Sequence, residues 1–153
     1  MKIRGGAATD LPIVDQILIE DSEFHVALEP KWMTSTTGIS SSDWEQYLTD
    51  ADKDALVYEL DGEVFGVVLL SVGKFGDPGM EYQPYGVVDE IAVTERHRDQ
   101  GIGRKLMAAA EAWAKSRGIK ALLLDVWKRN ERAIALYEKV GYQAHRQRMF
   151  KAI

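Results

Sequence analysis

The feature that most constrains the fold is an apolar segment that ends in a glycine-containing turn and continues as a helical pattern. Residues 85–93, YGVVDEIAV, are typical of a strand, and RHRDQGIGRKLM follows at residues 96–107. A helix is predicted from Gly101 to Arg117, and residues 121–127, ALLLDVW, have the length and apolarity of a buried strand. This order of elements predicts one α/β domain with a mixed sheet.

The first half of the chain is expected to add three strands and two helices. An Asp-Gly dipeptide between two apolar runs indicates a hairpin, and a proline after a capping residue indicates the start of a helix. The expected elements are a short edge strand at 2–4, a helix from Thr9 or Asp10 to about Glu20, a stretch without a sustained period at 21–40, a short helix from Ser41 or Ser42, and a hairpin of residues 55–60 and 63–72.

The second half is expected to close the sheet. Residues 73–85 form a long loop, which is either functional or disordered. Asn130 can cap a helix that Gly141 ends, since Ala133 and Leu136 recur at helical spacing between them. One or two last strands are expected within residues 142–152.

Composition excludes several kinds of site. The chain has no cysteine, and its histidines, His25, His97 and His145, show no spacing typical of metal ligands, so no metal site is expected. No run approaches the roughly 18 apolar residues of a membrane span, and residues 1–10 lack the apolar core of a signal peptide. We therefore expect a cytoplasmic protein that does not associate with membranes.

Charge is distributed unevenly along the chain, whose net charge is −5. Residues 1–60 carry 12 acidic and 4 basic side chains, whereas residues 95–153 carry 6 acidic and 14 basic ones. The basic part favours an anionic ligand and the acidic part a cationic one, although two solvated surfaces explain the charges equally well. No basic stripe is interleaved with aromatic residues, so nucleic acid is not an expected partner.

The glycine turn (residues 98–103) has the context of an anion site, because it follows a strand and opens a helix. Backbone N–H groups converge at such a turn, and the helix dipole adds a partial positive charge. Two other phosphate-binding motifs are excluded. A Walker loop needs Gly-Lys-Ser/Thr, which the turn lacks, and a dinucleotide fingerprint needs a third glycine where Leu106 stands. The alternative is that Gly101 and Gly103 serve only the turn.

Two stretches resemble the motifs of a known family. VTERHRDQGIGRKL at 93–106 resembles the acetyl-CoA-binding signature of the GNAT superfamily of N-acetyltransferases, Arg/Gln-x-x-Gly-x-Gly/Ala after a strand that ends in Val. NERAIALYEKVGY at 130–142 resembles its second motif, Asn-x-x-Ala-x-x-Leu-Tyr-x-x-x-Gly-Phe/Tyr. Glu95 replaces a frequent proline and His97 a frequent aromatic residue. The resemblance is strong over residues 86–143 and weaker over residues 1–72.

The resemblance implies a fold and a set of binding residues. The fold would be a single domain over residues 1–153, α/β (α+β), with a mixed, mostly antiparallel sheet of roughly six to seven strands flanked by about four helices. The implied acetyl-CoA contacts are the backbone of Ile91, Ala92 and Val93 for the pantetheine arm, the amides of Arg98, Asp99, Gln100, Gly101, Ile102 and Gly103 with Arg104 for the pyrophosphate, then Asn130, and Tyr137 facing the thioester sulfur.

Acetyl transfer to an amine needs a neutral amine and a stabilised leaving thiolate. The resemblance gives the second task to Tyr137, for which a packing role is the alternative. Glu90 and Asp125 are carboxylates within otherwise apolar strands, where a raised pKa would suit a general base, and we rank Glu90 first. Structural carboxylates or a water chain remain open alternatives. Strand alternation places Asp89 opposite Glu90 and makes it the weaker candidate.

The activity expected from the resemblance is transfer of an acetyl group from acetyl-CoA to a primary amine of a protein N-terminus, a lysine or a small molecule, by direct attack in a ternary complex. A non-catalytic acyl-CoA-binding or sensor module is the main alternative, and a nucleotide- or phosphosugar-binding protein is another. A homodimer is an open possibility. The candidates for lining the acceptor site are Phe24, His25, Glu29, Trp32, Tyr82 and Tyr85.

Overall fold

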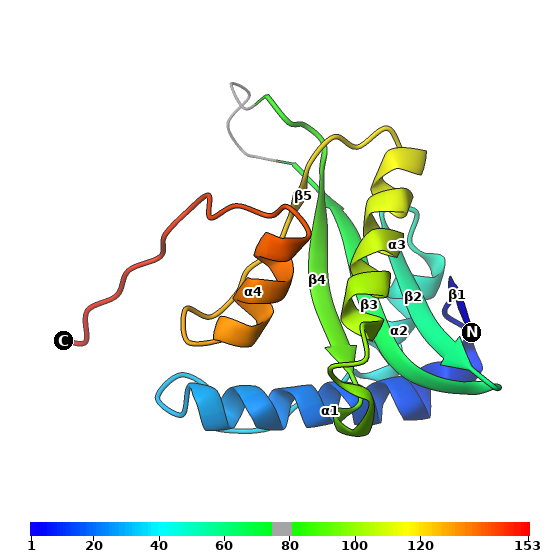
Figure 1. Ribbon diagram of the computed structural model, residues 1–153, viewed down its shortest axis with the longest axis horizontal. Helices are drawn as coiled ribbons and strands as arrows, with labels where there is room; N and C mark the ends of the chain where they lie inside the picture. The colour runs from blue at the N-terminus through cyan, green and yellow to red at the C-terminus, as the bar shows by residue number, and fades with distance from the viewer. Residues whose placement is uncertain (75–80) are drawn as a thin grey trace.

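The computed structural model describes residues 1–74 and 81–153 and has three layers, with a sheet between two pairs of helices (Figure 1). The strands are β1 (Lys2–Gly5), β2 (Lys53–Leu60), β3 (Glu63–Gly73), β4 (Tyr85–Val93) and β5 (Leu122–Leu123); the helices are α1 (Leu11–Leu28), α2 (Ser41–Thr49), α3 (Ile102–Ser116) and α4 (Glu131–Lys139). The order in the sheet is β1-β2-β3-β4-β5, antiparallel except for the parallel pair β4–β5. The expected mixed, mostly antiparallel α/β fold with four helices is confirmed.

Alternating side chains of β3 separate two hydrophobic cores. Val68 and Leu70 pack with α3, whereas Val67 and Leu69 pack with α1 and α2 on the other face of the sheet. All four side chains are nearly or fully inaccessible to solvent. This alternation is what a strand buried on both faces requires.

The local signals for the hairpin and three helices are confirmed. Asp61 and Gly62 both have positive φ, as the tight turn between β2 and β3 needs. Ser40 caps α2 by accepting a hydrogen bond from the Asp43 amide. The Asn130 side chain caps α4 by accepting a hydrogen bond from the Ala133 amide. Helix α3 ends just before Gly118, which has a φ of 69°.

Helix α1 is longer than the sequence pattern predicts, since it continues past Glu20 to Leu28. Its buried face is formed by Val14, Ile17, Leu18 and then Ser22, so the helical period continues with a polar residue. The Ser22 hydroxyl accepts a hydrogen bond from the Thr37 amide at 2.9 Å, which compensates its burial. A hydrophobic pattern cannot reveal a helical turn whose inward residue is serine.

The end of the sheet is also shorter than expected, and the described residues form five strands instead of six to seven. Of the strand predicted at 121–127 only Leu122 and Leu123 pair with β4, and residues 143–153 form no strand. This last segment extends away from the body of the protein (Figure 1), with Met149 84% exposed. A segment forms a strand only where its backbone pairs with a neighbouring strand, and residues 143–153 make no such pairing with the described chain. Part of the loop predicted at 73–85 lies outside the described residues.

Strands β4 and β5 separate soon after they pair, and this separation creates the site. Their register covers only Gly86 with Leu122 and Val87 with Leu123. Within the described chain, the later part of β4, through Val93, has no strand partner on that side. Helix α4 lies beside this gap (Figure 1). Among the described residues, none of the helices is long and apolar enough to span a membrane.

Candidate active site

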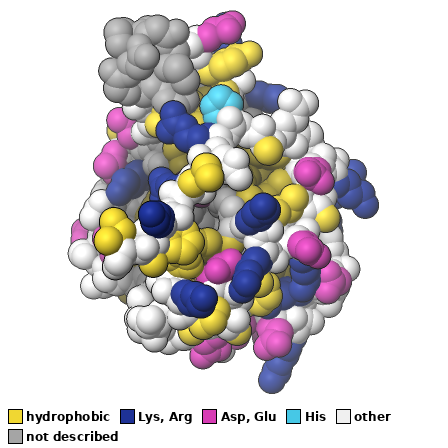
Figure 2. Space-filling model, turned by 90° about the vertical axis from the view of Figure 1, so that its left-hand side faces the viewer, with side chains coloured by type: hydrophobic (Ala, Val, Ile, Leu, Met, Phe, Trp, Pro, Cys, Tyr) yellow, Lys and Arg dark blue, Asp and Glu magenta, His cyan; other side chains and the backbone are white. Residues whose placement is uncertain are grey.

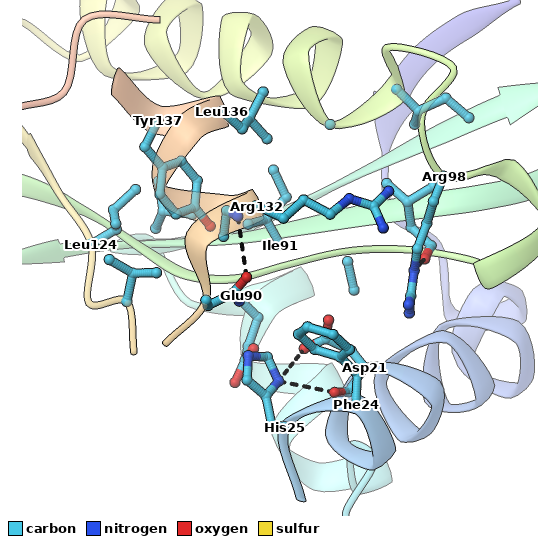
Figure 3. Close-up of a pocket in the computed structure, with 18 of the residues that line it drawn as sticks. Asp21, Phe24, His25, Glu90, Ile91, Arg98, Leu124, Arg132, Leu136 and Tyr137 are labelled. Atoms are coloured by element: carbon cyan, nitrogen blue, oxygen red, sulfur yellow. Dashed lines mark hydrogen bonds and ion pairs between the residues drawn. The ribbon is translucent and has the colours of Figure 1, made fainter. Parts of the chain in front are cut away.

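A cleft of about 460 Å³ occupies the gap between β4 and the chain that follows β5. It is bordered by β4, the glycine turn, α4 and the second half of α1 (Figure 3). The predicted catalytic and cofactor residues that line it are Glu90, Ile91, Ala92, Val93, Arg98, Asp99, Gly101, Ile102, Gly103, Arg104, Asp125, Asn130 and Tyr137. Of the predicted set only Gln100 is absent from the lining; its side chain donates to the Arg96 carbonyl.

The glycine turn is shaped by its backbone. Gly101 has a φ of 79° and precedes α3, while Asp99 has a φ of 63°, which is uncommon for a residue with a side chain. Arg98 donates from Nε to the Val93 carbonyl at 3.1 Å, which fixes the turn against the end of β4. The N-terminus of a 15-residue helix therefore opens toward the cleft.

The two glycines of this turn have different roles. A Cβ on Gly101 would meet nothing within 4 Å, so this residue is required for its left-handed backbone and not for space. A Cβ on Gly103 would lie 3.2 Å from Leu136 Cδ2, so Gly103 allows α3 to approach α4 closely. Gly101 is thus required by its backbone conformation and Gly103 by the packing of two helices.

Tyr137 lies on α4 with its ring turned into the cleft (Figure 3). Burial, together with the negative charges of Asp21 and Glu90, raises the pKa of Tyr137 to about 12. Its phenol therefore remains protonated at neutral pH and can act as a hydrogen-bond or proton donor. The ring also lies 5.9 Å from the Tyr142 ring, so Tyr137 packs as well as facing the cleft.

Glu90 lies on β4 between α1 and α4 (Figure 3). Its side chain is open to solvent through the cleft, yet desolvation by the surrounding protein, followed by the nearby Asp21 carboxylate, raises the pKa of Glu90. His25 opposes this shift. A carboxylate whose pKa is raised in a cleft is well suited to accept a proton.

The two other acidic candidates differ from Glu90 in their surroundings. Asp125 lines the cleft, but it follows β5 as an exposed residue and is not part of a buried strand as expected. Asp89 also borders the cleft because a β-bulge opposite Leu69 and Leu70 interrupts simple alternation. Its carboxylate accepts hydrogen bonds from Tyr47 at 3.0 Å and Ser71 at 2.9 Å, which gives it a structural role.

The charges around the cleft are separated. Arg98, Arg104 and Arg132 line the part nearest the glycine turn, and Arg132 donates to Asp99 at 2.7 Å. Asp21 and Glu90 lie in the part nearest α1 (Figure 3). Lys and Arg side chains are also numerous on the side of the molecule shown in Figure 2. One half of the cleft therefore suits an anion and the other a cation.

Two of the six residues predicted to line an acceptor site lie at the cleft. Phe24 and His25 line the cleft, whereas Glu29, Trp32, Tyr82 and Tyr85 do not. Trp32 instead packs edge-to-face on Phe150 with ring centroids 4.5 Å apart. The cleft residues that the sequence did not predict are Asp21, Met33, Val88, His97, Leu124, Val126, Trp127, Arg132, Ala133 and Leu136. Among the residues that the structure describes, no group of three or more His, Asp or Glu side chains is arranged to hold a metal ion.

The sequence and the fold match those of known proteins. The chain belongs to the Acetyltransferase (GNAT) family, whose model it matches over residues 15–142. An N-alpha-acetyltransferase of Sulfurisphaera tokodaii is 31% identical over 103 residues, covering 64% of this chain and 61% of that protein. The match spans 20% to 62% of the length of the first curated relatives.

Solved structures show the same fold. A mutant form of the BH1408 protein from Bacillus halodurans has a TM-score of 0.92 at 22% identity, covering 100% of this chain and 99% of that one. The aminoglycoside N-acetyltransferase AAC(6')-Iy, solved in complex with CoA, has a TM-score of 0.71 at 18% identity, covering 99% and 98%. These likenesses establish the architecture of the domain.

Proposed function

We propose that this protein is an N-acetyltransferase that moves the acetyl group of acetyl-CoA to a primary amine by direct attack in a ternary complex. The observation that carries the proposal is one cleft that contains the free edge of β4, the glycine turn and the Tyr137 phenol. Membership of the GNAT family and the names of its acetyltransferase relatives support it.

The fit of acetyl-CoA is supported by three features of the cleft. The edge of β4 around Ile91–Val93 offers backbone hydrogen bonds to an amide-containing arm. The amides of residues 98–103 and the start of α3 suit a pyrophosphate, with Arg98 and Arg104 nearby. Asn130 is engaged in capping α4 and would contribute through its position in the lining.

Tyr137 is proposed to donate to the sulfur of the leaving thiolate. Its raised pKa keeps the phenol protonated until negative charge develops on the sulfur. Such a contact strengthens in the transition state and therefore lowers the barrier to transfer.

Glu90 is proposed as the group that accepts the proton of the amine, with Asp125 as the second candidate. The raised pKa of Glu90 and its place opposite Tyr137 support this order. The proposal also accounts for two carboxylates, Asp21 and Glu90, in the part of the cleft that a cationic amine would enter. An ammonium group is attracted there before it is deprotonated.

The test is release of free CoA thiol from acetyl-CoA in the presence of a panel of peptide N-termini, lysine and small-molecule amines. Amine-dependent release, with an acetylated product identified by mass spectrometry, supports the enzyme. Tight CoA binding without any amine-dependent release supports the non-catalytic acyl-CoA-binding module. Stabilisation by ATP but not by acetyl-CoA in a thermal-shift assay contradicts both.

The homodimer and the cytoplasmic location stay predictions. Exposed Met149 and Phe150 in the last segment support a self-associating surface, as does the edge of β5 that no described strand pairs with. Sedimentation of the protein with and without residues 143–153 tests the dimer, and localisation of a tagged protein tests the location.

A further inference from the structure

Asp21 and His25 form a hydrogen-bonded pair on α1 that the proposed reaction does not yet use. His25 Nδ1 lies 2.9 Å from the Asp21 carbonyl oxygen and 3.0 Å from the Asp21 carboxylate Oδ2. Both partners are acceptors, so Nδ1 must carry a proton. In the neutral imidazole the other nitrogen, Nε2, is then unprotonated and can accept a proton.

The pair is positioned at the cleft beside Glu90. Phe24 packs edge-on against the imidazole with ring centroids 5.5 Å apart, and all three α1 residues line the cleft. Figure 3 shows Nδ1 turned toward Asp21, with Glu90 located between His25 and Tyr137. The charged groups that face His25 are Asp21 from its own helix and Glu90 from β4. The hydrogen bond to Asp21 is the main cause that raises the pKa of His25, and Glu90 adds to it.

We infer that the Asp21–His25 pair is the second stage of a proton relay in which Glu90 takes the proton of the acceptor ammonium and passes it to His25. This inference rests on the proposed acetyl transfer. In the first stage an N–H bond of the ammonium breaks and an O–H bond forms on Glu90. In the second stage that O–H bond breaks and an Nε2–H bond forms, which leaves an imidazolium paired with the Asp21 carboxylate. The imidazolium finally loses its proton to solvent.

The chemistry of the two groups explains why a second stage helps. An alkyl ammonium with a pKa of about 10.4 gives up its proton to any of these side chains unfavourably. The ordinary pKa of an imidazole is 6.5 and that of a glutamate is 4.5. An ordinary imidazole holds a proton more tightly than an ordinary carboxylate, so the proton is better accommodated on His25 than on Glu90. The fixed Nδ1–H and the negative Asp21 favour that final state.

The experiment compares pH profiles of kcat/KM for His25→Gln, Asp21→Asn and the wild type with one acceptor amine. The ionisation of the amine is then common to all three. We expect His25→Gln to lower kcat/KM at neutral pH about 10- to 100-fold and to remove an ionisation from the ascending limb. Asp21→Asn should move that limb to lower pH, because the pKa of His25 falls without the carboxylate. His145→Gln, in the exposed last segment, should match the wild type.

A second measurement keeps the relay testable if a variant is unstable. The NMR titration of the His25 ring in the wild type gives its pKa directly, and Asp21→Asn should lower it. Profiles of His25→Gln that match the wild type in shape, or a His25 pKa outside the range of the ascending limb, overturn the relay. A wild-type protein that acetylates no amine refutes the proposed function itself, which is a different result from an active enzyme insensitive to His25.

Discussion

Gly103 on α3 and Leu136 on α4 approach so closely that a Cβ on the glycine would lie 3.2 Å from the Leu136 side chain. The two helices border the cleft from adjacent sides, so their spacing sets its width near the glycine turn. Gly103, which belongs to the proposed anion site, therefore also determines how closely α3 packs against α4.

Replacing Gly103 by Val should weaken binding of CoA at least tenfold while the domain stays folded. The branched side chain would push Leu136 outward and displace α4 from the turn. Isothermal titration with CoA measures the loss, and Leu136→Ala in the same chain should restore part of it. Wild-type affinity in a folded Gly103→Val protein would contradict this role.

Tyr137→Phe should lower kcat by about 100-fold and leave the affinity for acetyl-CoA nearly unchanged. Loss of a general acid costs about 10²–10⁴-fold, and a thiolate is already a fair leaving group, so the lower end applies. The ring that packs near Tyr142 is retained. Turnover within about threefold of the wild type, together with a lower melting temperature, would leave Tyr137 as a packing residue.

Glu90→Gln should alter the ascending limb of the kcat/KM profile more than Asp125→Asn does. Glu90 has to be ionised to accept a proton, and its raised pKa places that ionisation above the usual range of a glutamate. Steady-state rates from acid to alkaline pH measure the limb with each variant. An effect of Asp125→Asn alone would reverse the order of the candidates, and no effect of either would favour a water chain.

Glu90→Gln should also stabilise the folded protein at neutral pH. Because folding raises the pKa of Glu90, the folded state favours the protonated carboxyl, and stability is lost as pH rises from below 4.5 through the raised pKa. Glu90→Gln should therefore melt at a higher temperature than the wild type at pH 7, with the difference vanishing in acid. The exposed Glu138→Gln variant controls for surface charge. A lower melting temperature for Glu90→Gln at pH 7 would show that the ionised group stabilises the fold.

The parts of the site that the sequence predicted depend on local chemistry. Gly101 needs a left-handed backbone before a helix, and Asn130 needs the free amides of a helix start, so their residue types reveal them. Asp21 and His25 are one helical turn apart on α1. Their pairing could not be predicted, because the polar Ser22 on the buried face interrupts the hydrophobic pattern that would have extended the helix to this point. The shortness of β5 depends on its distance from β4, which no local pattern records.

The cleft has two walls that are made by separate stretches of chain. The wall nearest the glycine turn comes from residues 90–137, which carry the family motifs, and the opposite wall comes from the second half of α1. On the proposed function, substitutions at Phe24 are expected to change which amine is accepted, while the groups that would bind the acyl donor stay intact. The residues that would select the acceptor amine could then change in evolution without any change in the residues that would bind the acyl donor.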